Sequence, residues 1–369
     1  MSYHETLSLS REEFEELLDH FEERTYDGRT YRHLPDYRRS LERGTALVGG
    51  AVVRGFPKIP RTLVLETGVP RQFDETVYVE EKLDGYNVRV VRLDGDVLAF
   101  TRSGIVCPFT TAKAQSLLDL DPLFDDYPDL MLCGEMVGPE NPYTTHDYPG
   151  VDSLAFRAFD VRHRETGASL PVPERRERCA AYDVPQVPFH GSFDPDAGVE
   201  PVERVIRDLD ERGREGVVMK TRDVSAQLKY TTSATNVDDL TYAFSLPFDY
   251  GQPFMFRRVI REAFQSVEWD EADEAARDRA HDLGEAILLS MRETVAEIDD
   301  GVAVGEDHTV RGDSEAIAAL FDHFRDMGLQ LDVTSDRRED GQRVVEFRKR
   351  TQKTNDKTRA YLDGKIVRE

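Results

Sequence analysis

Residues 80–89 read Glu-Glu-Lys-Leu-Asp-Gly-Tyr-Asn-Val-Arg, and this stretch decides how the rest of the chain is interpreted. An extended segment with alternating apolar residues, Val77 and Val79, leads into it, and a second extended run covers residues 88–93. The pattern predicts a strand, a tight loop at Asp84-Gly85 and a second strand. Lys82 would then stand at the end of the first strand, held close to the backbone.

A lysine fixed in this way is a candidate nucleophile. Its amine must lose its proton near neutral pH, and we expect desolvation or a neighbouring cation to favour the neutral form. The α-phosphorus of a nucleotide is a suitable target, because phosphoryl transfer depends mainly on positioning and charge neutralisation. The alternative is an exposed lysine that merely precedes an Asp-Gly turn.

The charge balance is the outlier in the composition. Asp and Glu number 72 against 48 Lys and Arg, which gives a formal net charge of −24, and only nine of the basic residues are lysine. This balance opposes non-specific binding of nucleic acid, so any such site must be a local basic patch. An acidic, lysine-poor surface is typical of halophilic proteins, in which high salt screens self-repulsion. Where arginine is the default cation, a retained lysine points to amine chemistry or a compact phosphate contact.

Cysteine usage and hydropathy bear on the compartment. The three cysteines, Cys107, Cys133 and Cys179, are widely spaced and form no Cys-x-x-Cys pair, which predicts reduced, buried thiols. The start of the sequence lacks the build of a signal peptide, and no apolar run is long enough to span a bilayer. We therefore expect a soluble cytoplasmic protein with no membrane partner. The 369 residues, 39% of them hydrophobic, suffice for two or three domains.

The first sixty residues predict little regular structure. Ser10 and Glu13 form a capping box, and apolar residues at helical spacing predict a short amphipathic helix after it. Residues 26–44 are polar and rich in arginine, which predicts a connector. Residues 46–53 alternate weakly, and the prolines of residues 54–60 predict a rigid extended loop.

Two polar residues stand out in the next predicted strands. Asp94-Gly95 predicts a hairpin whose second strand ends before Arg102. We expect this strand to pair with the strand of Lys82, which would put Arg102 at the same rim of the sheet. Residues 131–137 form an apolar run interrupted by Glu135. A glutamate in such a run costs on the order of several kcal/mol unless it is paired or binds a ligand. A structural salt bridge is the alternative to a ligand.

Further downstream, strands alternate with short helices. Residues 154–161 predict a strand that carries Phe159, and residues 214–220 another that carries Glu215 and Lys220. Residues 227–230 add Lys229. Short helices are predicted over residues 112–120, 171–181 and 202–212.

These segments together resemble the covalent nucleotidyltransferase superfamily of ATP-dependent ligases and capping enzymes. The match is to its motifs in their usual order, namely Lys82-Leu83-Asp84-Gly85 for motif I, Gly134-Glu135 for III, Phe156 to Asp160 for IIIa, Glu215 to Lys220 for IV and Gln227 to Tyr230 for V. The resemblance implies an α+β fold. Its core would be a nucleotidyltransferase domain, similar to ATP-grasp-like ligases, built of antiparallel sheets with helices.

The choice among ligases depends on fewer residues. DNA ligases and capping enzymes carry arginine five positions after the nucleophile, whereas this chain has Asn87, as RNA ligases do. Arg54-Gly55 resembles an element that RNA ligases carry upstream of the nucleophile. Several stretches look like the archaeal ATP-dependent RNA ligases that circularise RNA. One departure is Thr231, where some RNA ligases have a second lysine.

The resemblance implies ATP as cofactor, with Mg²⁺ or Mn²⁺, and RNA with 5′-phosphate and 3′-hydroxyl ends as partner. Lys82 would become a lysyl-AMP, AMP would pass to the RNA 5′-phosphate, and the 3′-hydroxyl would then expel AMP. The implied residues fall into four groups: Lys82, Lys220 and Lys229 as catalytic; Glu80, Asp84, Gly85, Asn87, Arg102, Glu135, Phe159, Lys220 and Lys229 as nucleotide-binding; Glu215 and Glu135 as metal ligands; Arg54 and Arg89 as RNA contacts. The alternatives are a DNA ligase, an end-adenylating enzyme, and a nucleic-acid-binding protein with a relict ligase fold.

We expect four regions. Residues 1–45 would be an N-terminal helical segment, 46–237 the adenylation domain, 238–305 a helical domain and 306–369 a small α/β domain. Two apolar stripes in the helical domain, around Phe256 and Leu288, are wide enough to pack on each other or on a second copy. The resemblance implies a homodimer there. The tail from Arg343 to Lys365 is rich in cations and is either a solvated helical face or an RNA-backbone patch.

Overall fold

The N-terminal region is a small four-stranded sheet with two helices. The computed structural model describes residues 2–144 and 146–366. The elements here are α1 (Tyr3–Thr6), α2 (Arg11–Leu18), β1 (Glu22–Tyr26), β2 (Arg29–His33), β3 (Ala46–Val48) and β4 (Ala51–Val53), and the strand order is β1-β2-β3-β4. The capping box of Ser10 and Glu13 is confirmed.

The prediction of an unstructured connector over residues 26–44, within a helical segment, is wrong. Residues 22–33 form a β-hairpin around Asp27-Gly28, both of which have positive φ, 47° and 71°. Two positive φ values are what a two-residue hairpin turn requires, and Asp-Gly is a favoured pair for it. Of the arginines in this stretch, Arg29 pairs with Asp96 and Arg32 with Glu23 across the hairpin.

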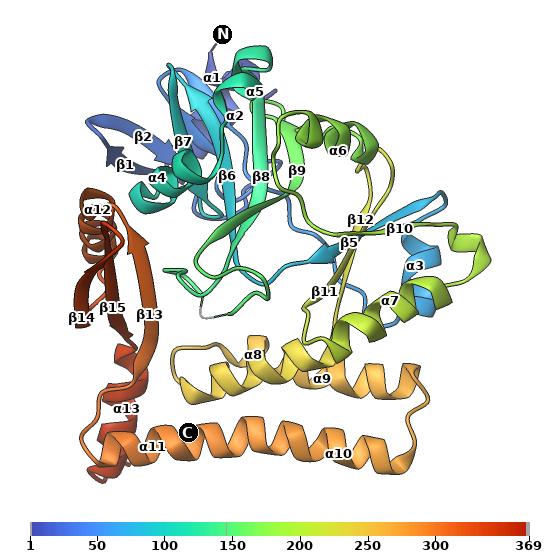
Figure 1. Ribbon diagram of the computed structural model, residues 1–369, viewed down its shortest axis with the longest axis vertical. Coiled ribbons are helices and arrows are strands. Elements are labelled where there is room, and N and C mark those ends of the chain that lie inside the picture. The colour runs from blue at the N-terminus through green and yellow to red at the C-terminus, as the bar shows by residue number, and fades with distance from the viewer. Residues whose placement is uncertain (1, 145, 367–369) are drawn as a thin grey trace.

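Two antiparallel sheets form the centre of the molecule (Figure 1). One sheet has the order β7-β6-β8-β9, with β6 (Tyr86–Leu93), β7 (Asp96–Thr101), β8 (Leu130–Val137) and β9 (Ala155–His163). The other has the order β10-β5-β11-β12, with β5 (Val77–Lys82), β10 (Phe189–Phe193), β11 (Gly216–Lys220) and β12 (Gln227–Thr231). The predicted α+β architecture with antiparallel sheets is confirmed.

The strands on either side of Lys82 belong to different sheets. β5 pairs with β10 and β11, whereas β6 pairs with β7 and β8. The expectation that the strand leading to Arg102 pairs with the strand of Lys82 is therefore wrong, because β7 pairs with β6. The loop of residues 83–85 crosses from one sheet to the other, so Lys82 lies where the two sheets meet.

Helices cover the outer faces of both sheets. They are α3 (Leu65–Gln72), α4 (Pro108–Leu117), α5 (Asp121–Asp126), α6 (Val172–Ala181) and α7 (Glu200–Glu211), with one 3₁₀ turn at Pro195–Ala197. α7 packs against β10 and β11, and α3 packs against β12, around a core that includes Val217 and Tyr230. Burial of these apolar faces fixes the positions of the strands that carry the functional side chains.

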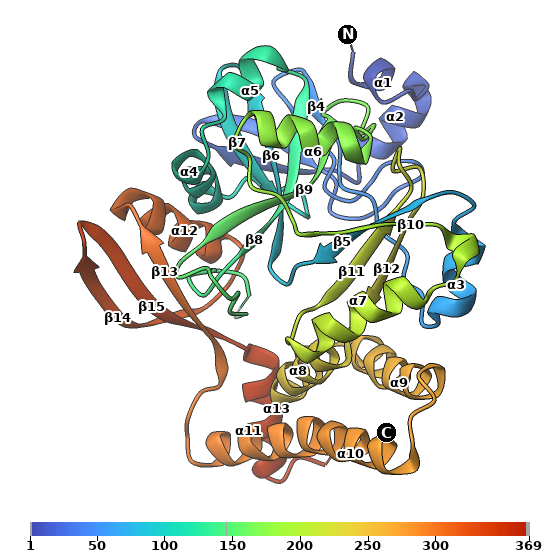
Figure 2. The same cartoon turned by 45° about the vertical axis from the view of Figure 1, so that its right-hand side comes forward.

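The C-terminal third consists of a helical layer followed by a small α/β unit. The helical layer comprises α8 (Ser233–Ser245), α9 (Gln252–Glu268), α10 (Asp273–Gly284), a π-helical turn (Glu285–Leu289) and α11 (Ser290–Asp299). It lies at the end of the molecule opposite the N-terminus (Figure 2). The α/β unit comprises β13 (Gly305–Gly312), α12 (Ser314–Asp326), β14 (Leu331–Glu339), β15 (Gln342–Arg350) and α13 (Gln352–Leu362), with strand order β13-β15-β14. Among the described residues, no helix is both long and apolar enough to cross a membrane.

The α/β unit shares a hydrophobic core with the central sheet. Phe324 and Phe347 belong to the same buried cluster as Phe109 and Phe156. The ammonium of Lys349 is buried beneath the residue 139–144 loop, where it donates to the carbonyl of Pro142. It also lies over the ring of Phe324, 4.9 Å from its centroid.

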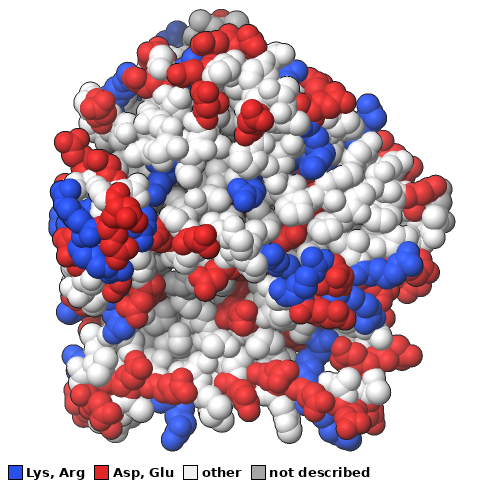
Figure 3. Space-filling model, in the orientation of Figure 1, with Lys and Arg blue, Asp and Glu red and all other residues white. Residues whose placement is uncertain are grey.

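The cations of the β15 segment are already engaged. Arg343 pairs with Asp336, Arg348 with Asp307 and Arg350 with Asp332. In the space-filling view, blue and red side chains alternate over β14 and β15 (Figure 3). This interleaving favours a solvated, self-paired surface over an RNA patch for this part of the tail.

Candidate active site

Lys82 ends β5 and faces a carboxylate on the neighbouring strand. Its backbone lies opposite Gly216 in β11, and its ammonium pairs with Glu215, which precedes that strand. Burial lowers the pKa of Lys82, but Glu215 and Glu135 outweigh burial and leave the pKa above its usual 10.5. The expectation that this amine is held neutral is therefore wrong for the chain alone, since two acids stabilise its ammonium form. A ligand that occupies those acids would release the amine.

Three carboxylates, those of Glu215, Glu135 and Asp84, act on this ammonium. Glu135 on β8 lies directly opposite Asn87 on β6, and burial raises the pKa of Glu135 to about 8. The pKa of Asp84 rises to about 7, chiefly through burial and then through Glu215. Among residues 2–144 and 146–366, Oε2 of Glu215 and Oδ1 of Asn87 are buried without a hydrogen-bond partner.

These orphaned oxygens fit a divalent cation. No group of three His, Cys, Asp or Glu within the described part of the chain could hold a metal by itself. Mg²⁺, however, usually takes one or two carboxylates and completes its shell with water and substrate phosphates. Glu215 and Glu135, with the amide oxygen of Asn87, match that partial donor set. A cation there would also offset the burial and the repulsion from Glu215 that raise the pKa of Glu135.

Lys229 supplies the second cation of the site. It lies on β12, next to β11, and its side chain makes no hydrogen bond or ion pair within residues 2–144 and 146–366. Burial, and then the charges of Lys82 and Arg61, lower its pKa to about 8. An unpaired, partly desolvated ammonium beside Lys82 is suited to an anionic ligand.

Lys220 and Glu80, by contrast, pair with each other. The ammonium of Lys220 is 2% exposed and donates to Oε2 of Glu80 at 2.8 Å and to the carbonyl of Phe159 at 2.6 Å. Sequence reasoning missed Arg175 and Arg176 of α6, which also pair with Glu80. The structure thus gives Lys220 a structural partner, and a direct contact with phosphate stays a prediction.

Replacing Glu80 by glutamine is expected to destabilise the protein near neutral pH. Burial would raise the pKa of Glu80, but Lys220 and Arg175 lower it from 4.5 to about 2. Because the folded-state pKa is depressed, the ionised group contributes stability above pH 4.5, of about 3 kcal/mol, which is lost as pH falls from 4.5 towards 2. Urea unfolding at several pH values measures this, with the exposed Glu174→Gln on α6 as control. A stability difference that does not shrink below pH 4.5 would contradict the assignment.

A cavity of about 700 Å³ connects these groups. Phe159 lines it and packs edge-on against Phe56, with ring centroids 5.1 Å apart. Phe156, by contrast, belongs to the buried core. The lining includes the following predicted residues: Glu80, Lys82, Gly85, Asn87, Arg102, Glu135, Phe159, Lys220 and Lys229. Arg43 and Lys58 also line it, and neither was assigned a role from sequence.

The two predicted RNA contacts lie elsewhere. Arg89 is fully buried and donates to the carbonyls of Arg54, Gly44 and Thr101, so its prediction as an RNA contact is wrong. Its guanidinium joins the 54–60 loop to the core. Arg54 pairs with Glu42 at 2.8 Å and is largely buried, so a contact with RNA would first have to break this pair.

Gly85 admits no side chain. A Cβ at this position would lie 2.2 Å from the carbonyl oxygen of Met136 and 2.9 Å from Cγ1 of Val137. We expect Gly85→Ala to displace the 83–85 loop, with a cost of about 1–3 kcal/mol in stability and a fall of about tenfold or more in nucleotide-dependent activity. Thermal unfolding and an activity assay measure both, with Gly284→Ala, whose Cβ would meet no atom within 4 Å, as control. Unchanged activity in Gly85→Ala would show that the loop tolerates the shift.

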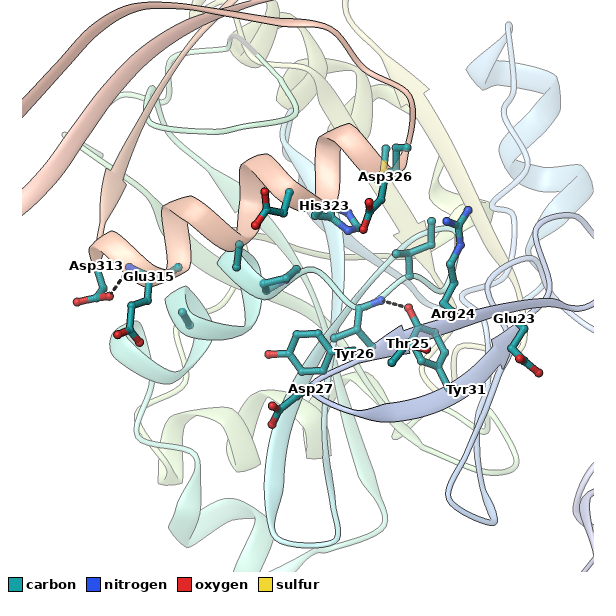
Figure 4. A pocket seen from close by; sticks show the side chains of 18 residues that line it. Glu23, Arg24, Thr25, Tyr26, Asp27, Tyr31, Asp313, Glu315, His323 and Asp326 are labelled. Carbon is teal, nitrogen blue, oxygen red and sulfur yellow. Dashed lines mark hydrogen bonds between the residues drawn. The ribbon is translucent and has the colours of Figure 1, made fainter.

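A larger cavity, of about 1070 Å³, lies between the β1–β2 hairpin and α12 (Figure 4). It includes none of the predicted site residues. Its walls carry six carboxylates, those of Glu23, Asp27, Asp313, Glu315, Asp322 and Asp326. Such walls repel phosphate, so the smaller cavity beside Lys82 is the better nucleotide site.

Comparison with known proteins agrees with this geometry. The family description "RNA ligase" matches residues 75–231, and "Ligase Pab1020 C-terminal region" matches residues 242–365. A solved structure described as archaeal ATP-dependent RNA ligase, form 2, is 40% identical over 99% of this chain and 98% of its own, with a TM-score of 0.93. The chain belongs to the archaeal ATP-dependent RNA ligase family.

Other relatives of this RNA ligase family member extend the comparison. An uncharacterised protein of Methanocaldococcus jannaschii is 41% identical over 89% of this chain and 86% of its own length. A candidate ATP-dependent DNA ligase from Aquifex aeolicus is 28% identical, covers 97% of this chain and 100% of its own, and has a TM-score of 0.90. The ligase fold predicted from the motifs is thus confirmed over nearly the whole length, and the chain is an ATP-dependent ligase.

Proposed function

We propose that this enzyme joins RNA 5′-phosphate and 3′-hydroxyl ends, including the two ends of one molecule, through a lysyl-AMP on Lys82. The observation that carries the proposal is the ammonium of Lys82 between Glu215 and Glu135, with unpaired Lys229 beside it. The amine of Lys82 would attack the α-phosphorus of ATP and release pyrophosphate. AMP would then pass to the RNA 5′-phosphate, and attack by the 3′-hydroxyl would form the phosphodiester and release AMP.

The remaining residues have supporting roles. Phe159 would pack against adenine, while Arg102 and Asn87 would contact the sugar or phosphates. Lys229 would stabilise charge that develops on the phosphoryl oxygens. Mg²⁺ or Mn²⁺, held by Glu215 and Glu135, would neutralise phosphate charge. Asp84 would orient the loop and the nucleophile.

The test offers competing substrates to the purified protein. A 5′-phosphorylated RNA strand and a matched nicked DNA duplex are incubated in parallel with ATP and Mg²⁺, at high salt in view of the acidic surface. We expect sealed or circular RNA, which resists phosphatase. Sealing of the DNA nick alone would favour a DNA ligase, the activity ascribed to the Aquifex aeolicus relative. Accumulation of adenylated RNA without sealing would favour an end-adenylating enzyme.

We also propose a homodimer through the helical layer. Large exposed apolar side chains concentrate on α9 and on residues 288–295, where Phe256 is 63% exposed, Val267 81% and Leu288 63%. A face of this kind marks an interaction site.

The three cysteines bear on the compartment. They are free and buried, as expected, which suits a reducing cytoplasm.

Charge on this face is expected to dissociate the dimer. Light scattering should give about twice the 42.1 kDa of one chain for the wild type. Phe256→Glu combined with Leu288→Glu should give the single-chain mass, because burying two carboxylates in an apolar interface is costly. Val302→Glu, at an exposed valine just past α11, is the control. A double variant that keeps the doubled mass would place the interface elsewhere.

A further inference from the structure

Three basic side chains on or against β12, those of Arg61, Lys229 and Arg261, lack the ion-pair partners that buried cations normally need. Arg261 on α9 is 0% exposed, and within residues 2–144 and 146–366 both of its terminal nitrogens have no hydrogen-bond partner. Arg61 and Lys229 make no side-chain hydrogen bond or ion pair within the same residues. Leaving buried guanidinium nitrogens unpaired costs free energy, and in a chain of net charge −24 carboxylates are abundant. The carboxylates that act on Arg61, Glu215 and Asp239, pair instead with Lys82 and Arg258, which leaves Arg61 open to a ligand.

The backbone fixes Arg61 against the active site. Its neighbours form a short parallel bridge with β12, in which the amide of Lys229 donates to Pro60 and the amide of Thr62 donates to the carbonyl of Lys229. Arg61 therefore stands beside Lys229 in space, although it lies 21 positions before Lys82 in the sequence. Burial, and then the charges of Arg258 and Arg261, lower the pKa of Arg61.

Contacts in the protein core hold the side chain of Arg261 in place near Arg61. Its guanidinium lies over the ring of Tyr230, 3.9 Å from the centroid, and its Nε donates to Oγ1 of Thr231. Tyr230 is in turn anchored through its hydroxyl to Glu268. Arg261 is too deeply buried to touch a ligand, so it would act only through the positive potential that its guanidinium adds near Arg61. Arg61, with intermediate exposure, is the residue that a ligand can reach.

The order of groups along the strands indicates which end of the nucleotide meets Arg61. Lys220, Glu80 and Phe159 form one end of the cavity, and Lys82 opposite Gly216 marks the other end of the same strands. Strand residues advance by about 3.3 Å each. Lys229 lies level with Glu80, because both face Val218, and Lys82 lies level with Thr231. Arg61, bridged to Lys229, therefore flanks the phosphates of an ATP bound between Phe159 and Lys82 from the β12 side.

We propose that Arg61, reinforced by Arg261, binds a phosphate group adjacent to the α-phosphate: the pyrophosphate end of ATP or the 5′-phosphate of RNA. The inference rests on the proposed function. As the bond between Nζ of Lys82 and the α-phosphorus forms, the bond from that phosphorus to the bridging oxygen breaks. Pyrophosphate takes that electron pair. The nitrogen loses two protons in all, one from the ammonium before attack and one as the phosphoramidate forms, and both pass to solvent water. Arg61 would hold the departing or arriving phosphate through charge-assisted hydrogen bonds.

The experiment measures each reaction step separately in wild type, Arg61→Ala, Arg61→Lys and Arg71→Ala. Arg71 is an exposed arginine on α3, and its variant is the control. Transfer of label from α-labelled ATP to the protein reports the first step, and transfer of AMP from labelled protein to 5′-phosphorylated RNA reports the second. The concentration of inorganic pyrophosphate that discharges labelled protein reports binding of the leaving group. Thermal unfolding accompanies each variant.

We expect Arg61→Ala to lose about ten- to a hundredfold in one of the two steps, which is the effect of a lost hydrogen bond to a charged group. Loss in the first step with weaker pyrophosphate discharge identifies the pyrophosphate end of ATP, and loss only in the second identifies the RNA phosphate. Arg61→Lys should recover part of the rate, and Arg71→Ala should match wild type. Wild-type rates in both steps, or a loss explained by unfolding, would overturn the inference. A wild type that takes no label would instead refute the proposed function.

Discussion

Replacing Lys82 by alanine is expected to abolish covalent labelling of the protein by α-labelled ATP. We do not expect Lys229, which lies on β12, or Lys220, which is tied to Glu80 and to the carbonyl of Phe159, to replace it. After denaturing electrophoresis, a label on lysine should be lost in acid and kept in alkali, which is the behaviour of a phosphoramidate. Lys353→Ala, at an exposed lysine of α13, is the matched control and should label fully.

A second measurement separates loss of the nucleophile from loss of fold. RNA that already carries a 5′-adenylate needs no lysyl-AMP, so Lys82→Ala should still join it to a 3′-hydroxyl. Melting temperature should also stay within a few degrees of wild type, since Lys82 is partly exposed. Labelling of Lys82→Ala at the wild-type level would place the nucleophile at another residue and remove the basis of the proposed function.

Replacing Lys229 by methionine is expected to slow lysyl-AMP formation by about a hundred- to a thousandfold, comparable to losing one preorganised donor at a developing charge. The fold should not suffer, because this ammonium has no ion pair in the described chain and is destabilised by burial and by Lys82. Single-turnover labelling and thermal unfolding measure the two effects.

Lys220→Met makes the complementary control for this prediction. It removes a 2%-exposed ammonium that pairs with Glu80, so it should lower the melting temperature, whereas Lys229→Met should not. Equal destabilisation in the two variants would mean that Lys229 also holds the fold together. Unchanged labelling in Lys229→Met would assign phosphate stabilisation to another cation.

The sequence predicts strands and their functional residues well because short-range patterns carry that information. The apolar run interrupted by Glu135 indicates a strand over residues 131–137, and β8 covers Leu130–Val137. The same holds for residues 214–220 and 227–230. What local patterns lack is the identity of the neighbouring strand. The loop after Lys82 looks like a hairpin turn, yet it passes between two sheets.

Arginine is the residue type that sequence reasoning assigned least well. Arg89 was predicted as an RNA contact but holds three carbonyls inside the protein. The sequence pattern predicts no role for Arg175, although it is 1% exposed and pairs with Glu80, 95 positions away. A long side chain can satisfy its charge at great sequence separation, so its role depends on tertiary contacts. Arg61 was missed for the same reason.

The buried ammonium of Lys349 joins two segments that are far apart in the sequence. It receives its hydrogen-bond acceptor from Pro142, more than 200 positions earlier, and its ring contacts from Tyr143 and Phe324. A change in the 139–144 loop that withdrew the carbonyl of Pro142 would deprive this buried ammonium of its acceptor, at a cost of about 3–5 kcal/mol. The shape of that loop therefore contributes to holding the C-terminal α/β unit against the central sheet.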